Sequence, residues 1–358
     1  MEDFSKRLME ILSDGMLCLG LIIGHELQLF NSLAAVSSEI QPATSTTVAE
    51  KADLKERYVR EWLCLMACGK IIEVDESGEK FWISGDRVGE LCGDQPNALL
   101  TFQQIVLMSA KAYPTLVGLF RKDGPLGMDN GMFDEFDKRM AALSEASHQQ
   151  YIISKFVPAT GLQNKLEEGG IYALDVGCGR GMHIAELGSH YPKCFFTGID
   201  LSLDAVVGAN KKRDEANAGL DNVSYMQMNG QMMKDDWTEK FDWVMMFDAC
   251  HDQTRPDLCL KEIYRVLKSD GLFSMIETDG TSNVYKDKEM VTSTFMYGVS
   301  LTHCLPVGMN SEDALGLGAM WGREKAKQLL SAAGFQKIEV CQNPFSEYSS
   351  NILYLCYK

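Results

Sequence analysis

The sequence is poor in long apolar runs, in positive charge and in paired cysteines. The longest apolar run near the start, Met16–Gly24, ends at His25-Glu26 and is far shorter than the roughly 20 residues of a membrane-spanning helix. Ser13-Asp14-Gly15 precedes this run, where a secretory signal would carry basic residues. These absences argue against a membrane protein and a secreted one. We therefore predict a cytoplasmic protein that does not contact membranes.

The charge and the cysteines narrow the class of protein further. The chain of 358 residues has 34 basic and 50 acidic residues, a net charge of −16, which repels nucleic-acid backbones and anionic membranes. Its 11 cysteines form no CxxC pairs, as expected for free thiols in a reducing compartment. Cys64 and Cys68 share one helix face, but nothing indicates further ligands. We expect no metal site.

Residues 1–95 have the element order of a winged helix. One apolar helix is expected over Met16–Leu33, a second begins at Ser45 as its N-cap, and a third covers Lys55–Cys68 with Tyr58, Trp62, Leu65 and Met66 on its apolar face. Two short strands, Ile71–Val74 and Lys80–Ile83, then flank a polar turn. Three helices followed by a hairpin predict a winged-helix domain.

The charge of this module argues against DNA binding. Residues 1–100 hold 9 basic and 17 acidic residues, whereas a DNA-binding domain needs a basic stripe. The hairpin itself carries Glu73, Asp75, Glu76 and Glu79 against Lys80 alone. We therefore expect no nucleic-acid partner and assign the module to packing or to formation of a homodimer.

The rest of the chain divides into a helical connection and an α/β domain. Residues 96–165 are mostly helical and are expected to form a linker and a substrate lid, and residues 166–358 alternate short apolar strands with helices. The strands are expected at Ile171–Val176, Phe195–Ile199, Val223–Met228, Phe241–Phe247, Leu272–Ile276, Lys337–Cys341 and Asn351–Tyr357. The predicted fold class is α/β: a Rossmann-like, mostly parallel seven-stranded sheet with an antiparallel last hairpin, behind an N-terminal winged helix.

A glycine-rich turn follows the first of these strands. The segment reads Leu174-Asp175-Val176-Gly177-Cys178-Gly179-Arg180-Gly181, and its glycines permit a tight turn and close approach to a nucleoside. A nicotinamide-dependent oxidoreductase would need its third glycine at position 182, which is Met182. The G-x-G-x-G spacing suits S-adenosylmethionine (SAM), which has no pyrophosphate to seat on a helix N-terminus.

The ends of the next strands supply further candidates for the cofactor site. Asp200 follows Gly177 by 23 residues and is placed to accept hydrogen bonds from both ribose hydroxyls. Asn229 either contacts the adenine or forms an Asn-Gly turn with Gly230. The complete set assigned to cofactor binding is Asp175, Gly177, Cys178, Gly179, Asp200, Leu201, Asn229, Gly230, Phe247 and Asp248.

The catalytic candidates follow the fourth strand. His251 lies beyond its carboxyl end, where ligands of parallel sheets bind, so its imidazole can take a proton from an attacking hydroxyl, thiol or amine. Asp252 either orients His251 or caps the next helix. Two residues are assigned to the substrate side, Tyr151 and His303. His303-Cys304 lines the substrate or belongs to the core.

These motifs resemble those of class I SAM-dependent methyltransferases. The resemblance rests on Leu174–Gly181, Asp200 and the segment Phe247–Gln253, and it is closer to the group with an N-terminal winged helix, known from mycobacteria and animals, through His303–Pro306 and Trp321–Ala326. Plant small-molecule O-methyltransferases share the architecture; the resemblance implies that His251 is the general base and that the winged helix mediates dimerisation. Three positions depart from the usual pattern: Gln253 stands for Trp, Ser269-Asp270 replaces Pro-Gly in the turn after Lys268, and Asn229 stands for Asp.

The sequence thus predicts a SAM-dependent methyltransferase that acts on an O, N or S atom of a small molecule. The alternative is a regulatory protein that senses SAM or another ligand and uses its winged helix as a contact module.

Overall fold

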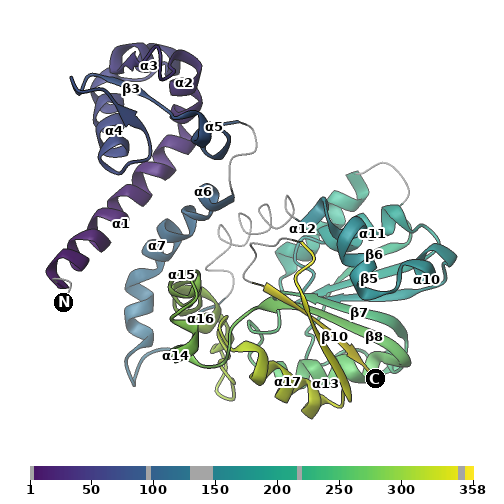
Figure 1. Ribbon diagram of the computed structural model, residues 1–358. Coiled ribbons are helices and arrows are strands. Elements are labelled where there is room, and N and C mark those ends of the chain that lie inside the picture. Colours follow the sequence, from purple (N-terminus) through teal and green to yellow (C-terminus); the bar gives the residue numbers. More distant parts are fainter. Residues whose placement is uncertain (1–3, 94–97, 130–147, 216–219, 346–350) are drawn as a thin grey trace. The chain divides into compact units, whose positions relative to one another are not determined.

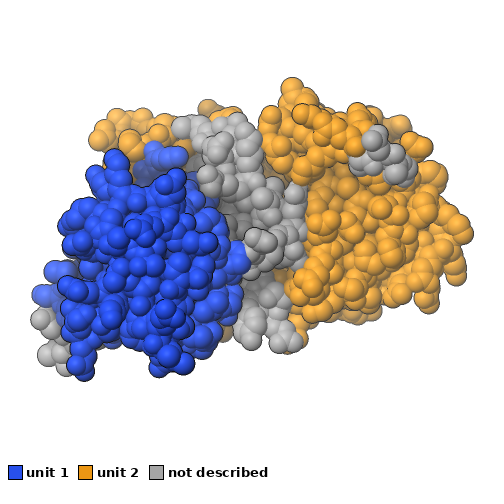
Figure 2. Space-filling view, turned by 90° about the horizontal axis from the view of Figure 1, so that it is seen from above, with its two compact units in different colours: residues 1–111 blue, residues 112–358 orange. Residues whose placement is uncertain are grey.

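The computed structural model describes residues 4–93, 98–129, 148–215, 220–345 and 351–358. Its contacts group the chain into two compact units, Met1–Lys111 and Ala112–Lys358 (Figure 2). The division into three parts at residues 95 and 165 stays a prediction, and the expected lid lies partly outside the described residues.

The first unit opens with two helices where the sequence predicted one. Helix α1 covers Phe4–Glu26 and α2 covers Leu29–Val36. The expectation of a continuous helix over Met16–Leu33 was wrong because Gln28 adopts a left-handed conformation, with φ 54°, which ends the helical path. By length and composition alone, α1 could cross a membrane.

The remaining elements of the first unit form the expected winged helix. They are β1 (Ala43–Thr44), α3 (Ser45–Ala52), α4 (Glu56–Cys68), β2 (Glu73–Val74), β3 (Lys80–Trp82), α5 (Gly85–Leu91) and α6 (Ala98–Phe102), and the strands pair in the order β1-β3-β2. The N-cap of α3 is Thr44, whose hydroxyl accepts the Thr47 N–H. The prediction of Ser45 as cap was wrong, because its hydroxyl instead donates to Glu56.

The core of this unit is built around Trp62 on α4. Its ring packs edge-on against Phe30 with centroids 5.0 Å apart, and its Nε1 donates to the Gly20 carbonyl of α1 at 2.9 Å. Val59, Leu63 and Met66 complete the buried face of α4. Tyr58, which was expected on that face, is 76% exposed. The second half of α1 is thus a packed core helix of the winged-helix domain.

The second unit is built on a seven-stranded sheet (Figure 1). Helix α7 (Gln104–Leu119) contains the boundary between the units, and α10 (Gln163–Glu168) precedes the first strand. The strands are β4 (Tyr172–Val176), β5 (Phe195–Asp200), β6 (Val223–Gln227), β7 (Phe241–Phe247), β8 (Leu267–Thr278), β9 (Lys337–Gln342) and β10 (Asn351–Tyr357). Their order is β6-β5-β4-β7-β8-β10-β9, and β10 runs antiparallel to both neighbours. The predicted topology is confirmed. The segment Leu267–Gly271, expected as a turn, lies within the bounds of β8 but at an irregularity, since Leu267 pairs with Phe241 and the next residue to pair with β7 is Leu272.

The sheet separates two apolar cores because successive side chains of a strand point to opposite faces. On β7, Trp243, Met245 and Phe247 join one core, while Val244 and Met246 join the other. Helices α11 (Met182–His190) and α12 (Leu203–Glu215) cover the first face, and α13 (Pro256–Val266) and α17 (Gly322–Ala333) cover the second. This layering brings the carboxyl ends of β4, β5, β7 and β8 to one edge, where the candidate site residues lie.

Candidate cofactor and active site

The glycine turn after β4 tolerates no side chain at two of its positions. Gly177 has φ 74°, and a Cβ built on it would lie 2.6 Å from the Ala249 Cβ. Gly181 has φ 80°, and a Cβ there would meet the ring of Tyr225. The Tyr225 hydroxyl donates to the Gly181 carbonyl at 2.7 Å and fastens the turn to β6. The backbone therefore forms an open cradle at the end of β4.

Asp175, just before this turn, is a buried acid that has no hydrogen-bond partner among the described residues. It is 1% exposed, and neither carboxylate oxygen accepts a hydrogen bond from any described residue. Burial, together with the nearby Asp200, raises the pKa of Asp175 to about 8. A buried acceptor without a donor is costly unless a ligand supplies one. The amino group of SAM is such a donor, so the site fits that cofactor.

Asp200 closes the other side of the turn. Its carboxylate accepts the backbone N–H groups of Gly179 and Ser202, each at 2.8 Å. It therefore links the glycine turn to the tip of β5, where the sequence placed a ribose acceptor. Gly179 has φ 52° and no atom within 4 Å of a built Cβ, so this part of the cradle is open.

The other residues assigned to the cofactor lie around this cradle in different environments. Cys178 is buried, and burial raises the pKa of its thiol well above the usual value. Leu201 is 68% exposed. The Asn229 side chain accepts the Gln231 N–H at 2.9 Å. It therefore takes part in a turn with Gly230, which was one of the two alternatives that the sequence allowed; the other was contact with the adenine. The roles of these residues toward the cofactor remain predictions.

A histidine pair covers the cradle beside Asp175. His183, on the first turn of α11, lies with its Nδ1 4.0 Å from the Asp175 carboxylate and its Nε2 2.8 Å from His148 Nδ1. The His183 ring stacks on the Phe247 ring with centroids 3.8 Å apart, and the His148 ring stacks on the Phe345 ring with centroids 4.0 Å apart. Burial lowers the pKa of both rings, that of His148 to about 4. Both are therefore neutral at pH 7 and form an aromatic wall.

His251 lies in the loop after β7 and is anchored by an acid that sequence reasoning missed. The His251 ring is 4% exposed, and its Nδ1 lies 2.5 Å from an oxygen of Glu277, which is fully buried at the end of β8. Glu277 also accepts the Cys250 N–H at 2.8 Å and the Trp321 indole N–H at 3.2 Å. These contacts fix the orientation of the His251 ring and direct Nε2 away from the Glu277 carboxylate.

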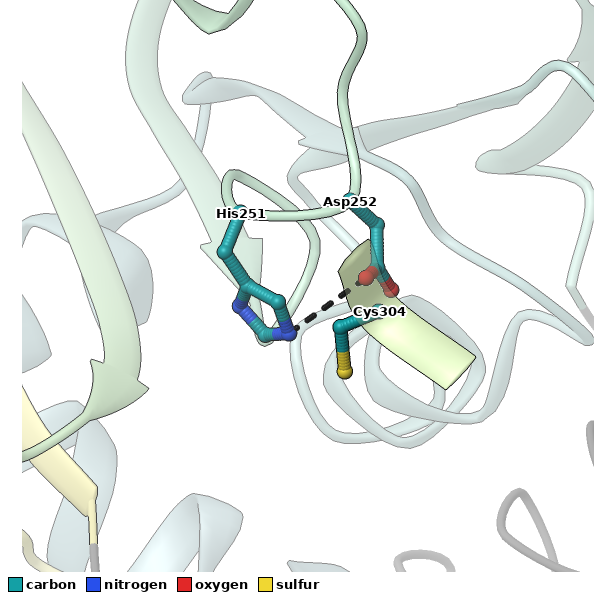
Figure 3. A group of neighbouring side chains, drawn as sticks. All are labelled: His251, Asp252 and Cys304. Carbon is teal, nitrogen blue, oxygen red and sulfur yellow. Dashed lines mark ion pairs between the residues drawn. The ribbon is translucent and has the colours of Figure 1, made fainter. Parts of the chain in front are cut away.

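Two further side chains converge on the Nε2 of His251 (Figure 3). The Asp252 carboxylate lies 3.5 Å away, and the Cys304 thiol belongs to the same group, in which the three ligand atoms lie within 4.8 Å of one another. Asp252 therefore faces Nε2, the ring nitrogen that Glu277 does not contact. The orienting role considered for Asp252 goes to Glu277, which holds the opposite nitrogen.

The crowding of acids changes the proton affinities of this region. Burial opposes the charged form of His251, but the negative charges of Glu277 and Asp252, together with Cys304, outweigh it and raise the pKa of His251 well above its usual value. Asp248 has φ 46°, and both its oxygens accept from the Asn351 amide at 2.7 Å. Burial, followed by repulsion from Glu277, raises the pKa of Asp248 to about 7.

The two substrate-side candidates differ in their surroundings. His303 is buried beside Cys304 in η4 (Ser300–Cys304). Tyr151 is half-buried at the start of η2 (Ile152–Phe156), and the Lys155 ammonium lies 4.4 Å from its ring centroid. Of the neighbouring residues His303 and Cys304, Cys304 is the one whose side chain lies close to His251.

Together, the parallel sheet, the open glycine cradle and the buried acids define a Rossmann-like methyltransferase. Family models agree: residues 167–334 match a methyltransferase domain, and residues 15–92 match an Rv2258c-like winged helix-turn-helix domain. The chain thus carries a methyltransferase domain behind a winged helix-turn-helix domain, the organisation of a class I SAM-dependent methyltransferase, and its cofactor is SAM. No curated protein sequence matches it significantly.

Solved structures with the same fold cover the whole chain at low identity. A candidate O-methyltransferase of Nostoc punctiforme matches with a TM-score of 0.72 and 14% identity, covering 99% of both chains. The mitomycin 7-O-methyltransferase MmcR matches at 0.67 and 15%, covering 99% of this chain and 97% of its own. Human N-acetylserotonin methyltransferase, solved with SAM, matches at 0.61 and 18%, covering 100% and 98%. These likenesses establish the shared fold.

Proposed function

We propose that this methyltransferase transfers the methyl group of SAM to an O, N or S atom of a small molecule, with His251 as general base. The observation that carries the proposal is the fixed orientation of the His251 ring. Because Glu277 holds Nδ1 at 2.5 Å, Nε2 is the nitrogen that can accept a proton from the acceptor molecule. Two proteins of similar structure are a mitomycin 7-O-methyltransferase and an N-acetylserotonin methyltransferase, which favours a hydroxyl acceptor.

Bound SAM supplies an electrophilic methyl group. The chain therefore needs to bind SAM and the acceptor molecule, align them, and remove the proton of the acceptor. Asp175 offers an acceptor to the cofactor amino group, and Asp200 holds the glycine turn and faces the ribose. His251 takes the acceptor proton, and Glu277 stabilises the imidazolium that forms. Alignment of the reacting atoms contributes most of the remaining acceleration.

We also propose that the protein is a cytoplasmic homodimer joined through residues 1–95. Its support is the acidic charge of this module, which disfavours DNA, together with exposed apolar side chains on α1: Leu8 is 53% and Leu12 62% exposed. Light scattering of the purified chain should give twice the monomer mass. Substitution of both leucines by glutamate should give the monomer mass, and a monomeric wild type would contradict the assignment.

The test of methyl transfer begins with the cofactor. Calorimetry should show SAM binding by the wild type, and Asp200→Ala should weaken it because the glycine turn loses its anchor. A screen of metabolite extracts with radiolabelled SAM then identifies the acceptor. Failure of the wild type to bind SAM would refute the proposal of methyl transfer.

The role of His251 is tested on the acceptor thus identified. His251→Ala should lower kcat by about 10²–10⁴-fold and leave SAM affinity unchanged. His190, exposed at the end of α11, provides the matched control, since His190→Ala should retain full activity. Undiminished transfer by His251→Ala would remove it as the base.

A further inference from the structure

The side chains around His251 have the composition of a zinc site. An imidazole nitrogen, a carboxylate oxygen and a thiol sulfur, from His251, Asp252 and Cys304, lie within 4.8 Å of one another (Figure 3). Zinc binds this mixture of ligand types, and three protein ligands with one open position are typical of its exchangeable sites. This cluster could not be predicted from the sequence, because Cys304 lies 53 residues beyond His251.

The distances fit tetrahedral coordination. Ordinary Zn–N and Zn–O bonds place an imidazole nitrogen and a carboxylate oxygen about 3.4 Å apart on a tetrahedral ion, and His251 Nε2 lies 3.5 Å from Asp252 Oδ1. That oxygen is buried and has no hydrogen-bond partner in the described part of the chain. The thiol sulfur needs to lie about 3.6 Å from the nitrogen, and in the structure all three ligand atoms lie within 4.8 Å of one another.

The groups behind the ligands also match a metal site. A histidine that binds a metal through one ring nitrogen usually donates the other N–H to a carboxylate, and Glu277 occupies that place at 2.5 Å from Nδ1. Glu277 is itself held by the Cys250 N–H and the Trp321 indole N–H. The Asp252 side chain is 27% exposed, so an ion can enter from its side. Asp252, Glu277 and a Cys304 thiolate together offset the charge of a divalent ion.

We propose that His251, Asp252 and Cys304 bind a zinc ion that inhibits the enzyme. The ion occupies the lone pair of Nε2 with which His251 accepts the acceptor proton, so metal binding and methyl transfer exclude each other. The ring and the thiol release their protons to solvent as the ion binds. The inhibitory effect rests on the proposed function of His251, whereas metal binding itself does not.

Cobalt(II) is the probe for binding, because it occupies zinc sites and reports thiolate ligation through near-ultraviolet charge-transfer absorption. The full-length, metal-free protein is titrated with Co²⁺ without oxygen, cofactor or acceptor. We expect the band to saturate at one equivalent and to be lost when Zn²⁺ is added. Cys304→Ser should abolish the band, whereas Cys64→Ser, an exposed cysteine of α4, should retain it.

Two further variants distinguish loss of a metal ligand from misfolding of the protein. Asp252→Asn should weaken Co²⁺ binding, and Glu277→Gln should weaken it about 10–100-fold through loss of the carboxylate behind the ring, with SAM affinity as the check on folding. Absence of the band in the wild type, or a band that persists in Cys304→Ser, would overturn the proposal. Since no acceptor is present, these outcomes are independent of whether methyl transfer occurs. With the acceptor in hand, Zn²⁺ should inhibit the wild type at least about tenfold more strongly than Cys304→Ser.

Discussion

We expect the buried Asp175 to make the binding of SAM depend on pH. With a pKa of about 8, only about one Asp175 in a hundred is ionised at pH 6 and about one in eleven at pH 7. The carboxylate must ionise to accept a cationic amino group, so binding of SAM releases a proton. Apparent affinity should therefore rise about ninefold between pH 6 and pH 7, or about 1.3 kcal/mol. The cofactor amino group stays mostly protonated in this window, since α-amino groups titrate near about 7.7–8.0.

Isothermal titration calorimetry measures both consequences. The dissociation constant of SAM is determined at pH 6.0, 6.5 and 7.0, and the enthalpy at pH 7.0 is compared across buffers of different ionisation enthalpy. We expect release of about 0.9 proton per cofactor bound. Asp175→Asn should bind more weakly and lose the pH dependence, whereas Asp221→Asn, an exposed control, should behave as the wild type. A constant affinity without proton release in the wild type would refute the argument that Asp175 is neutral before binding.

Three further substitutions test the anchoring contacts. Glu277→Gln removes an anion that raises the pKa of His251, so the rise of kcat with pH, which follows deprotonation of the ring, should move to lower pH in a pH–rate profile. Gly177→Ala forces a side chain into φ 74° and a 2.6 Å contact and should lower the free energy of unfolding in urea by about 1–3 kcal/mol. Tyr225→Phe leaves the Gly181 carbonyl without its 2.7 Å donor and should cost about 1 kcal/mol in the same assay.

The sheet could be predicted from sequence because its strands are buried on both faces. Such strands read as short apolar runs, and all seven runs proposed here coincide with β4–β10. The errors arose where the sequence carries no distinct local signal. Gln28 breaks a helix without glycine or proline, and its hydrogen bonds go to His25, Asn31 and Ser32 inside the predicted helix. The segment Leu267–Gly271 has turn-forming residues and lies within β8, at a shift of register against β7.

The site was predictable to the extent that its residues follow strand ends. Asp175, Asp200 and His251 were proposed in this way, and Glu277 could have been, because it directly follows the predicted strand Leu272–Ile276. The contacts across elements could not be predicted. The His148–His183 pair joins residues 35 positions apart, and neither residue belongs to a motif that indicates the other.

The distribution of buried acids explains why this sheet edge suits SAM. Each of the strands β4, β5, β7 and β8 delivers a carboxylate there: Asp175, Asp200, Asp248 and Glu277. Glu277 contacts His251, and Asp175 lies 4.0 Å from the neutral His183. The raised pKa values of Asp175 and Asp248 reflect burial and also repulsion between neighbouring acids. A sulfonium or ammonium group stabilises the ionised form of these acids, whereas a pyrophosphate disfavours it. The preference for SAM over a dinucleotide thus resides in the acids at the strand ends as much as in the glycine spacing.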